Sequence, residues 1–161
     1  MTSTLSRFIL VSALLLCTSK AMAQLPNSYG APITLESAKR ATAAAIAKAR
    51  ANNWSVAIAV VDPSGNLVYF EKMDGTQNAS SVVAVDKARA AALFKRPTKA
   101  FQDVLAAGGD GLRVLSLQGA VPIEGGVPLL MNGVIVGAIG VSGVTSAQDG
   151  QCAQAGAEIL K

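Results

Sequence analysis

The sequence predicts four helices, and the first has apolar residues at the spacing of an amphipathic helix. In the first of them, Ala38, Ala45 and Ile46 lie on one face, and this face is mostly alanine, so the helix can pack closely on a sheet. The predicted helices cover residues 35–51, 80–94, 99–106 and 146–160.

Polar residues at the start of these segments predict where the helices begin, because a side-chain oxygen can accept a hydrogen bond from a free N–H of the first turn. The predicted N-caps, in chain order, are Thr34, Ser80 or Ser81, Thr98 and Thr145. Gln148 follows Thr145 at the spacing of a capping box. Glu36 adds a carboxylate to the first turn of the first helix, where the helix dipole favours negative charge.

Extended segments occur in pairs around turn residues. The segments 55–61 and 67–73 flank Asp62-Pro63-Ser64-Gly65-Asn66, which predicts a hairpin. The first segment is apolar at nearly every position, as in a central strand covered on both faces. Asn132-Gly133 between 127–131 and 134–141 predicts a second hairpin with a type I′ turn. A short strand is also expected at 120–123.

The predicted order is α-β-β-α-α-β-β-β-α, with hairpins and no βαβ alternation. This order is typical of an α+β domain, so we expect an antiparallel five-stranded sheet flanked by helices. The length of 161 residues allows one domain of ordinary size.

The first 23 residues are expected to direct export. Arg7 precedes the apolar run 8–17, and Ala21-Met22-Ala23 has the pattern of a cleavage site, which together indicate a signal peptide. The alternative is a buried N-terminal helix. Residues 24–32 are interpreted as a linker or extended arm and 33–161 as the single domain. The mature protein is then periplasmic or secreted.

The charge balance excludes nucleic acid as a partner, and the hydropathy excludes a membrane span after cleavage. Cleavage would remove two of the 14 basic residues and none of the 10 acidic ones, which leaves a nearly balanced surface and no case for nucleic acid. No stretch reaches the roughly 18 to 20 apolar residues needed to span a bilayer, so no membrane span is expected after cleavage.

The residue types present restrict the chemistry. The chain has no histidine, which excludes Ser-His-Asp and Cys-His catalytic groups and histidine-ligated zinc or haem iron. No carboxylate spacing resembles a calcium loop, so no metal site is predicted. Cys152 remains after cleavage and is interpreted as a buried small residue; an intermolecular disulfide or a reactive thiol are the alternatives.

Glycines and charged residues near the second hairpin are the candidate site. Gly125-Gly126 precedes a strand and Gly137, Gly140 and Gly143 interrupt or end one, which indicates either a ligand cleft or close packing of helices on the sheet. The loop 95–99 is cationic and could hold a carboxylate or phosphate. Asp86 and Lys87 are adjacent on one helix and point about 100° apart, so they are not a mutual pair.

Several motifs occur in order along residues 33–160. The most specific segment comprises Gly125-Gly126-Val127-Pro128-Leu129, Asn132-Gly133, 136–143 and Gln148-Asp149. The upstream motifs are Met73-Asp74-Gly75, Ser80, 86–91 and Arg96-Pro97-Thr98. Together, in this order, they resemble the GlcG/HbpS family.

The resemblance implies an antiparallel sheet with flanking helices, homo-oligomers, and a haem-binding role in or beyond the cell envelope. Other members accompany glycolate-utilisation genes, and a related domain is fused to a corrinoid adenosyltransferase. Haem, or a similar tetrapyrrole, is therefore the expected cofactor. Without histidine, its iron would be ligated by a hydroxyl, Met73, Met131 or Tyr69, and its propionates would pair with basic residues. These basic residues are Lys87, Arg89, Arg96 and Lys99.

The sequence thus predicts an exported small-ligand binding protein that forms homo-oligomers, and binding is favoured over catalysis. The predicted ligand-binding residues are Met73, Asp74, Lys87, Arg96, Thr98, Glu124, Gly126, Ser142 and Asp149. One alternative is an enzyme for a small carboxylate metabolite that uses Asp74, Lys87, Glu124 or Asp149 as acid or base, and catalytic residues are otherwise unknown. Another is an oligomeric partner protein without catalysis.

Overall fold

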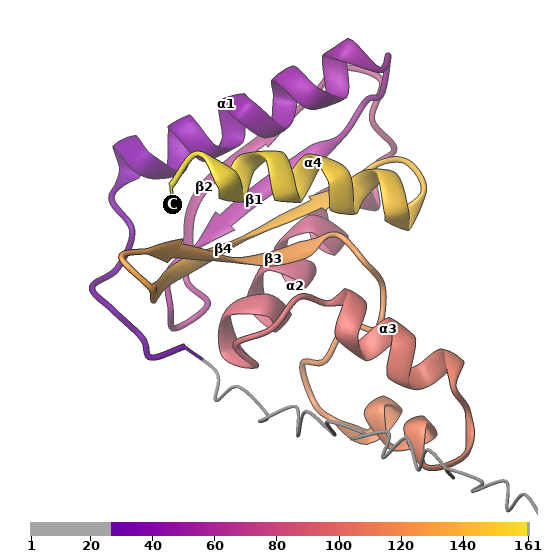
Figure 1. Cartoon of the computed structure of the whole chain (residues 1–161). Coiled ribbons are helices and arrows are strands. Elements are labelled where there is room, and N and C mark those ends of the chain that lie inside the picture. The colour runs from indigo at the N-terminus through magenta and orange to yellow at the C-terminus, as the bar shows by residue number, and fades with distance from the viewer. Residues whose placement is uncertain (1–26, 161) are drawn as a thin grey trace, which may run out of the picture.

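The computed structural model describes residues 27–160, which form a three-layer α+β arrangement (Figure 1). One antiparallel sheet has the strand order β2-β1-β4-β3. The strands are β1 (Ala57–Val61), β2 (Leu67–Lys72), β3 (Gly126–Met131) and β4 (Val134–Ser142). The helices are α1 (Leu35–Ala51), α2 (Ser80–Leu93), α3 (Lys99–Ala106), the 3₁₀ helix η1 (Gly109–Ser116) and α4 (Ser146–Glu158).

The predicted fifth strand at 120–123 is wrong, since the sheet has four strands. Pro122 has no N–H to donate to a strand ladder. Gly119 has a φ of +84°, and the N–H of Ala120 donates to the carbonyl of Leu117, so the chain turns here. The segment continues in irregular conformation from η1 to Glu124.

Both predicted hairpins are present. β1 pairs with β2 and β3 pairs with β4, in each case antiparallel. Asn132 and Gly133 have φ values of +51° and +77°, as a type I′ turn requires. β1 lies inside the sheet and is buried at all five positions, as its apolar sequence predicted.

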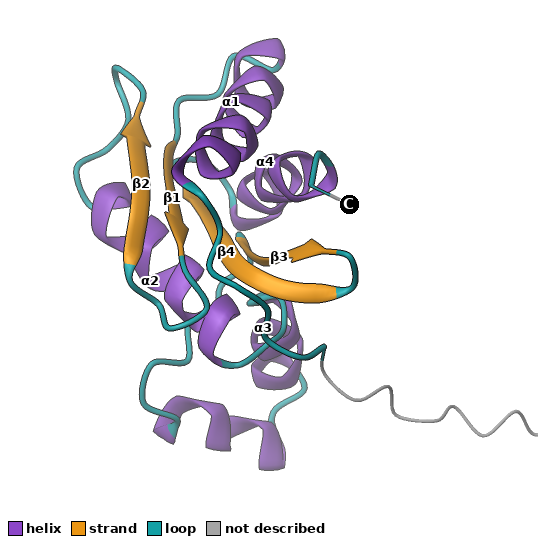
Figure 2. Cartoon of the chain, turned by 90° about the vertical axis from the view of Figure 1, so that its left-hand side faces the viewer, coloured by secondary structure: helices purple, strands orange, loops and turns teal. Residues whose placement is uncertain are grey.

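Helices α1 and α4 lie on one face of the sheet and α2 lies on the other (Figure 2). An apolar cluster fills each of the two interfaces. Alternate residues of β1 divide between them: Ile58 and Val60 pack with α1 and α4, whereas Ala57 and Ala59 pack with α2. The α2 layer consists almost entirely of alanine, so this helix approaches the sheet closely. A Cβ on Gly140 of β4 would collide with the backbone of α2 at Ala84 and Ala88. Close helix packing therefore explains this glycine, which was one of two interpretations of the glycine pattern.

Two of the four predicted caps are confirmed and two are wrong. The Thr34 side chain accepts a hydrogen bond from Ser37 N, and Thr145 and Gln148 form a capping box. Neither Ser80 nor Ser81 caps α2, since Ala79 occupies that position without a side-chain bond. Thr98 precedes α3, but it is in helical conformation and its hydroxyl accepts from Gly126 N instead.

The N-terminal boundary of the described chain lies beside β4. Ser28 and Gly30 exchange backbone hydrogen bonds with Ile135, and Ile33 N donates to Val136 O. The Tyr29 hydroxyl donates to the carbonyl of Ala92 on α2. The predicted signal peptide lies outside the described residues. Among the described helices, none has the length and apolar character needed to cross a membrane.

Candidate ligand groove and the ion pair behind it

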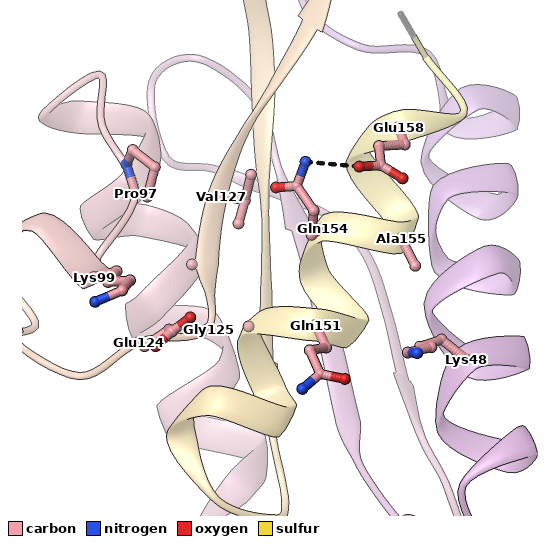
Figure 3. A pocket seen from close by; sticks show the side chains of 12 residues that line it. Lys48, Pro97, Lys99, Glu124, Gly125, Val127, Gln151, Gln154, Ala155 and Glu158 are labelled. Carbon is pink, nitrogen blue, oxygen red and sulfur yellow. Dashed lines mark hydrogen bonds between the residues drawn. The ribbon is translucent and has the colours of Figure 1, made fainter.

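A groove with a volume of about 660 Å³ crosses the face formed by α4, β3 and the start of α3 (Figure 3). Its accessible surface is mainly apolar, with Pro97, Val127 and Ala155 among the lining residues. Lys48 on α1 and Lys99 on α3 lie at opposite ends, on either side of the exposed residues of α4. The other lining residues are Glu124, Gly125, Gly126, Gly150, Gln151, Gln154 and Glu158.

The wall of the groove at Gly125-Gly126 is held by three hydrogen bonds. Thr98 and Gly126 form two: Thr98 N donates to Gly126 O at 3.0 Å, and Gly126 N donates to the Thr98 hydroxyl at 2.9 Å. Val141 N donates to Gly125 O at 2.9 Å. Gly125 has a φ of +131°, which side-chain-bearing residues rarely adopt. A Cβ on Gly126 would collide with the carbonyl of Lys87 and with the Thr98 side chain. Both glycines are therefore required by this close approach of α2 and the start of α3.

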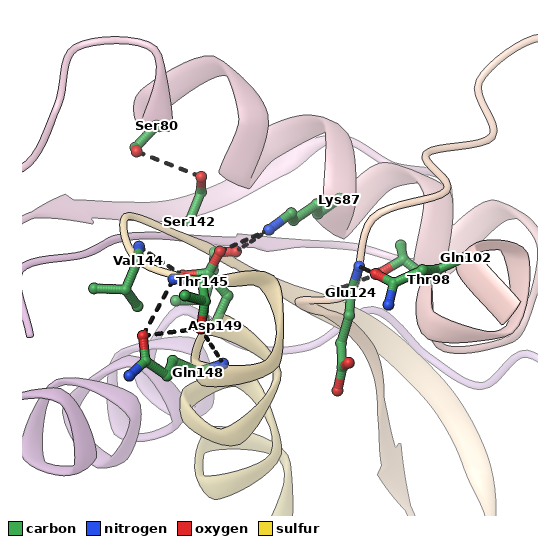
Figure 4. A network of polar contacts seen from close by, with 12 residues as sticks. Ser80, Lys87, Thr98, Gln102, Glu124, Ser142, Val144, Thr145, Gln148 and Asp149 are labelled. Atoms are coloured by element: carbon green, nitrogen blue, oxygen red, sulfur yellow. Dashed lines mark hydrogen bonds and ion pairs between the residues drawn. The ribbon is translucent and has the colours of Figure 1, made fainter. Parts of the chain in front are cut away.

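An ion pair lies directly behind this wall (Figure 4). Lys87 Nζ donates to Asp149 Oδ2 at 2.8 Å and to the carbonyl of Val141 at 3.0 Å. The two residues are 1% and 2% exposed. Asp149 Oδ1 accepts from Val144 N, so the pair joins α2, β4 and the first turn of α4. A Cβ on Gly125 would lie 2.8 Å from Lys87 Nζ, which shows how closely the ammonium underlies the groove wall.

Burial raises the pKa of the Asp149 carboxyl, because removal from water penalises the charged form. The Lys87 ammonium and the backbone N–H groups of Val144 and Gly143 oppose this rise. Both charges are enclosed and paired with each other, so neither group presents a free acid or base to the groove.

The predicted ligand-binding residues do not form a single site in the structure. Glu124 and Gly126 line the groove, and Lys87, Thr98 and Asp149 lie behind its wall. Ser142 is buried beside Ser80, with 3.4 Å between the two hydroxyl oxygens.

Three predicted residues lie elsewhere. Met73 and Asp74 line a separate hollow of about 390 Å³, together with Arg50, Glu71 and Lys72. That hollow has a mainly polar surface. The exposed Arg96 side chain donates to the carbonyl of Phe94 and lies 5.7 Å from the Phe101 ring centre.

The four residues considered as acid or base are also separated. Lys87 and Asp149 are enclosed, Asp74 is exposed on the other hollow, and Glu124 alone of the four lines the groove. Within residues 27–160, no group of three or more cysteine or carboxylate side chains is arranged to hold a metal ion.

Sequence reasoning did not identify the part of the groove contributed by α1 and α4. Gln151, Gln154 and Glu158 occur at positions i, i+3 and i+7 of α4 and therefore form one polar stripe. This spacing is the sequence signal from which the α4 side of the groove could have been predicted. Lys48 lies in the last turn of α1 and gives no local signal of its own.

Comparisons with known proteins assign the chain to a family. The family model described as "Haem degrading protein HbpS-like" matches residues 33–158. The chain belongs to the HbpS-like family. The resemblance to GlcG and HbpS inferred from the sequence is thereby confirmed.

Individual relatives support the same assignment. Protein GlcG of Escherichia coli K12 is 39% identical over 95 residues, which cover 59% of this chain and 69% of GlcG. A double mutant of Streptomyces reticuli HbpS has a TM-score of 0.74 at 31% identity, covering 88% of this chain and 95% of HbpS. A PduOC structure in complex with haem has a TM-score of 0.72 at 26% identity, covering 81% of this chain and 96% of PduOC.

Proposed function

We propose that the protein binds haem or a related tetrapyrrole in the groove between β3 and α4. The observation that carries this proposal is a mainly apolar groove of about 660 Å³ bordered by lysines, since small-molecule sites combine apolar walls with few polar groups. The HbpS-like family assignment and the haem complex of the related PduOC support the choice of ligand.

The residues that line the groove offer contacts for the ring and for a carboxylate of such a ligand. Pro97, Val127 and Ala155 offer apolar contact to a macrocycle. Lys99 is already paired with Asp103 at 2.7 Å, whereas Lys48 has no described carboxylate within salt-bridge distance. Lys48 is therefore the cation assigned to a propionate.

The groove does not supply the usual axial ligands of haem iron. Haem proteins ligate iron through histidine, cysteine, methionine or tyrosine. None of the described residues that line the groove is of these types, and none carries a hydroxyl. The fit therefore concerns the ring and its carboxylates.

A hemin titration of two charge-reversal variants tests the location. Lys48→Glu replaces an attractive charge in the groove by a repulsive one, so we expect hemin to bind about tenfold more weakly. Lys72→Glu makes the same change in the Met73 hollow and is expected to leave the affinity unchanged. Absorbance in the Soret region gives both dissociation constants. Weaker binding in Lys72→Glu with normal binding in Lys48→Glu would move the site to the Met73 hollow.

Export is a second part of the proposal. Its support is the sequence of Arg7, the apolar run 8–17 and Ala21-Met22-Ala23. N-terminal sequencing of the protein from the cell envelope or medium should find Gln24 first. Recovery of the uncleaved chain from the cytoplasm would contradict export.

Self-association is the third part. Large apolar side chains are exposed on and around α3 and η1, which protrude from the sheet in Figure 1. They include Val104, Leu112, Leu115, Leu117 and Ile123. Light scattering on the purified protein at micromolar concentration is expected to give a mass above that of one chain. A single-chain mass would contradict the oligomer.

A further inference from the structure

We propose that the groove recognises the tetrapyrrole ring and its carboxylates and is indifferent to the central metal. Metal-free protoporphyrin IX and zinc protoporphyrin should then bind as tightly as hemin. This inference rests on the proposed function and adds that the central metal does not determine which tetrapyrroles bind.

Within residues 27–160, the cysteine, methionine and tyrosine side chains all lie away from the groove. Cys152 is 0% exposed within the layer between α4 and the sheet. Met73 lines the polar hollow, and Met131 lines another hollow near Ile33 and Val134. None of the three can reach a ring lying between Val127 and Ala155 without refolding of the core or a change of site.

Both described tyrosines are engaged at other places. The Tyr69 hydroxyl donates to Glu71 at 3.1 Å, and the Tyr29 hydroxyl donates to the carbonyl of Ala92 at 2.9 Å. The hydrogen bond to Glu71 raises the pKa of Tyr69, and burial raises the pKa of Tyr29. Since iron binds the phenolate form, both phenols are poorly prepared as ligands even apart from their position.

Three charged side chains of the groove are already engaged with neighbouring residues. Lys99 bonds to both oxygens of Asp103, and this hydrogen bond raises the pKa of its amine, which keeps the nitrogen protonated. Glu158 accepts a hydrogen bond from Gln154 at 3.1 Å. The Glu124 side chain packs on Gly150, so closely that a Cβ there would collide with its carboxylate.

The remaining interactions between the groove and the ligand do not involve the central metal. Apolar contact acts on the macrocycle, and Lys48 acts on a propionate, and both are identical in hemin, zinc protoporphyrin and protoporphyrin IX. Glu124 and Glu158 add negative charge to the groove, so they repel the propionates of all three ligands equally.

Quenching of Trp54 fluorescence provides one readout for all three ligands, because Trp54 is the only tryptophan of the chain and every porphyrin absorbs its emission. We expect the three dissociation constants to agree within about threefold, and Glu124→Gln to strengthen all three alike. Lys48→Glu should weaken all three by the same factor. Lys72→Glu serves as the matched control.

Three results separate this inference from the proposed function. Hemin binding that exceeds protoporphyrin IX binding by about tenfold or more would overturn the inference and leave haem binding intact. Selective loss of hemin binding in Glu124→Gln would do the same, because it would identify that carboxylate as an iron ligand. Absence of saturable quenching by any of the three would overturn the proposed function itself.

Discussion

At the residue scale, burial governs two groups in the core, the Cys152 thiol and the Lys87–Asp149 pair. Cys152 is fully buried, and burial raises its pKa to about 11, with a further contribution from the charge of Asp149. The thiolate is the reactive form of cysteine. The structure thus confirms the interpretation of Cys152 as a buried small residue.

Cys152 should not react with a thiol reagent in the native protein at pH 8, because the thiol is both protonated and inaccessible. The same reagent should label it within minutes in denaturant. Absorbance of the released chromophore measures both rates. Equal labelling rates in native and denaturing conditions would contradict this account.

The raised pKa also links stability to alkaline pH. The pKa is about 11 in the folded protein against a reference of 9.0, so the contribution of this group is complete below pH 9 and is lost as pH rises to 11. The loss is on the order of 2 kcal/mol. Urea unfolding at pH 8 and pH 11 should show this additional loss in the wild type and not in Cys152→Ala. Parallel losses in both proteins would refute the assignment.

The ion pair should behave as a coupled unit. Lys87→Met or Asp149→Asn alone leaves one buried charge without its partner and should cost about 3 kcal/mol or more of unfolding free energy. The double variant should cost clearly less than the sum of the two, since no unpaired charge remains.

The exposed pair Lys99–Asp103 is the matched control for this cycle. Its side chains are 50% and 59% exposed, so its coupling should be at most about 0.5 kcal/mol. Additive costs for Lys87→Met and Asp149→Asn would mean that the two buried groups are not coupled.

At the scale of the elements, α2 packs closely against β4. Gly140→Ala would bring a Cβ against the α2 backbone at Ala84 and should cost about 3 kcal/mol. Gly133→Ala is the comparison, because it has a φ of +77° and open space around it, so only about 1 kcal/mol of backbone strain is expected. Urea unfolding measures both. A smaller cost at Gly140 than at Gly133 would contradict this packing.

Most elements could be predicted from the sequence because their signals are local. The apolar run of β1 and the turn Asn132-Gly133 specify their own conformations, as do the caps Thr34 and Thr145. Thr98 was mistaken for a cap because its hydroxyl bonds to Gly126, 28 residues away. The apolar residues at 120–123 resemble a strand, but Pro122 removes a ladder donor there.

The candidate site could be predicted only in part, because it is assembled from distant segments. Lys87 and Asp149 were both singled out, yet their partnership spans 62 positions and no periodicity encodes it. Likewise, Lys48 meets the groove only through the packing of α1 beside α4. Met73 and Asp74 follow β2 and therefore lie at another hollow.

At the scale of the whole molecule, the three layers form a mainly apolar groove, and the buried Lys87–Asp149 ion pair lies behind its wall. The ion pair ties α2, β4 and α4 together behind Gly125, so the wall facing a ligand is fixed before binding. Such preorganisation reduces the entropy lost on binding. The central claim is that a tetrapyrrole occupies this groove.

The most direct test is the amide NMR spectrum of the protein titrated with zinc protoporphyrin, whose ring current shifts nearby signals. Our account predicts that the largest shifts occur at the backbone amides of Gly125, Gly126 and Gly150, and that those of Lys72 and Asp74 stay unchanged. Shifts centred on Lys72 and Asp74, or no saturable spectral change with either zinc protoporphyrin or hemin, would contradict it.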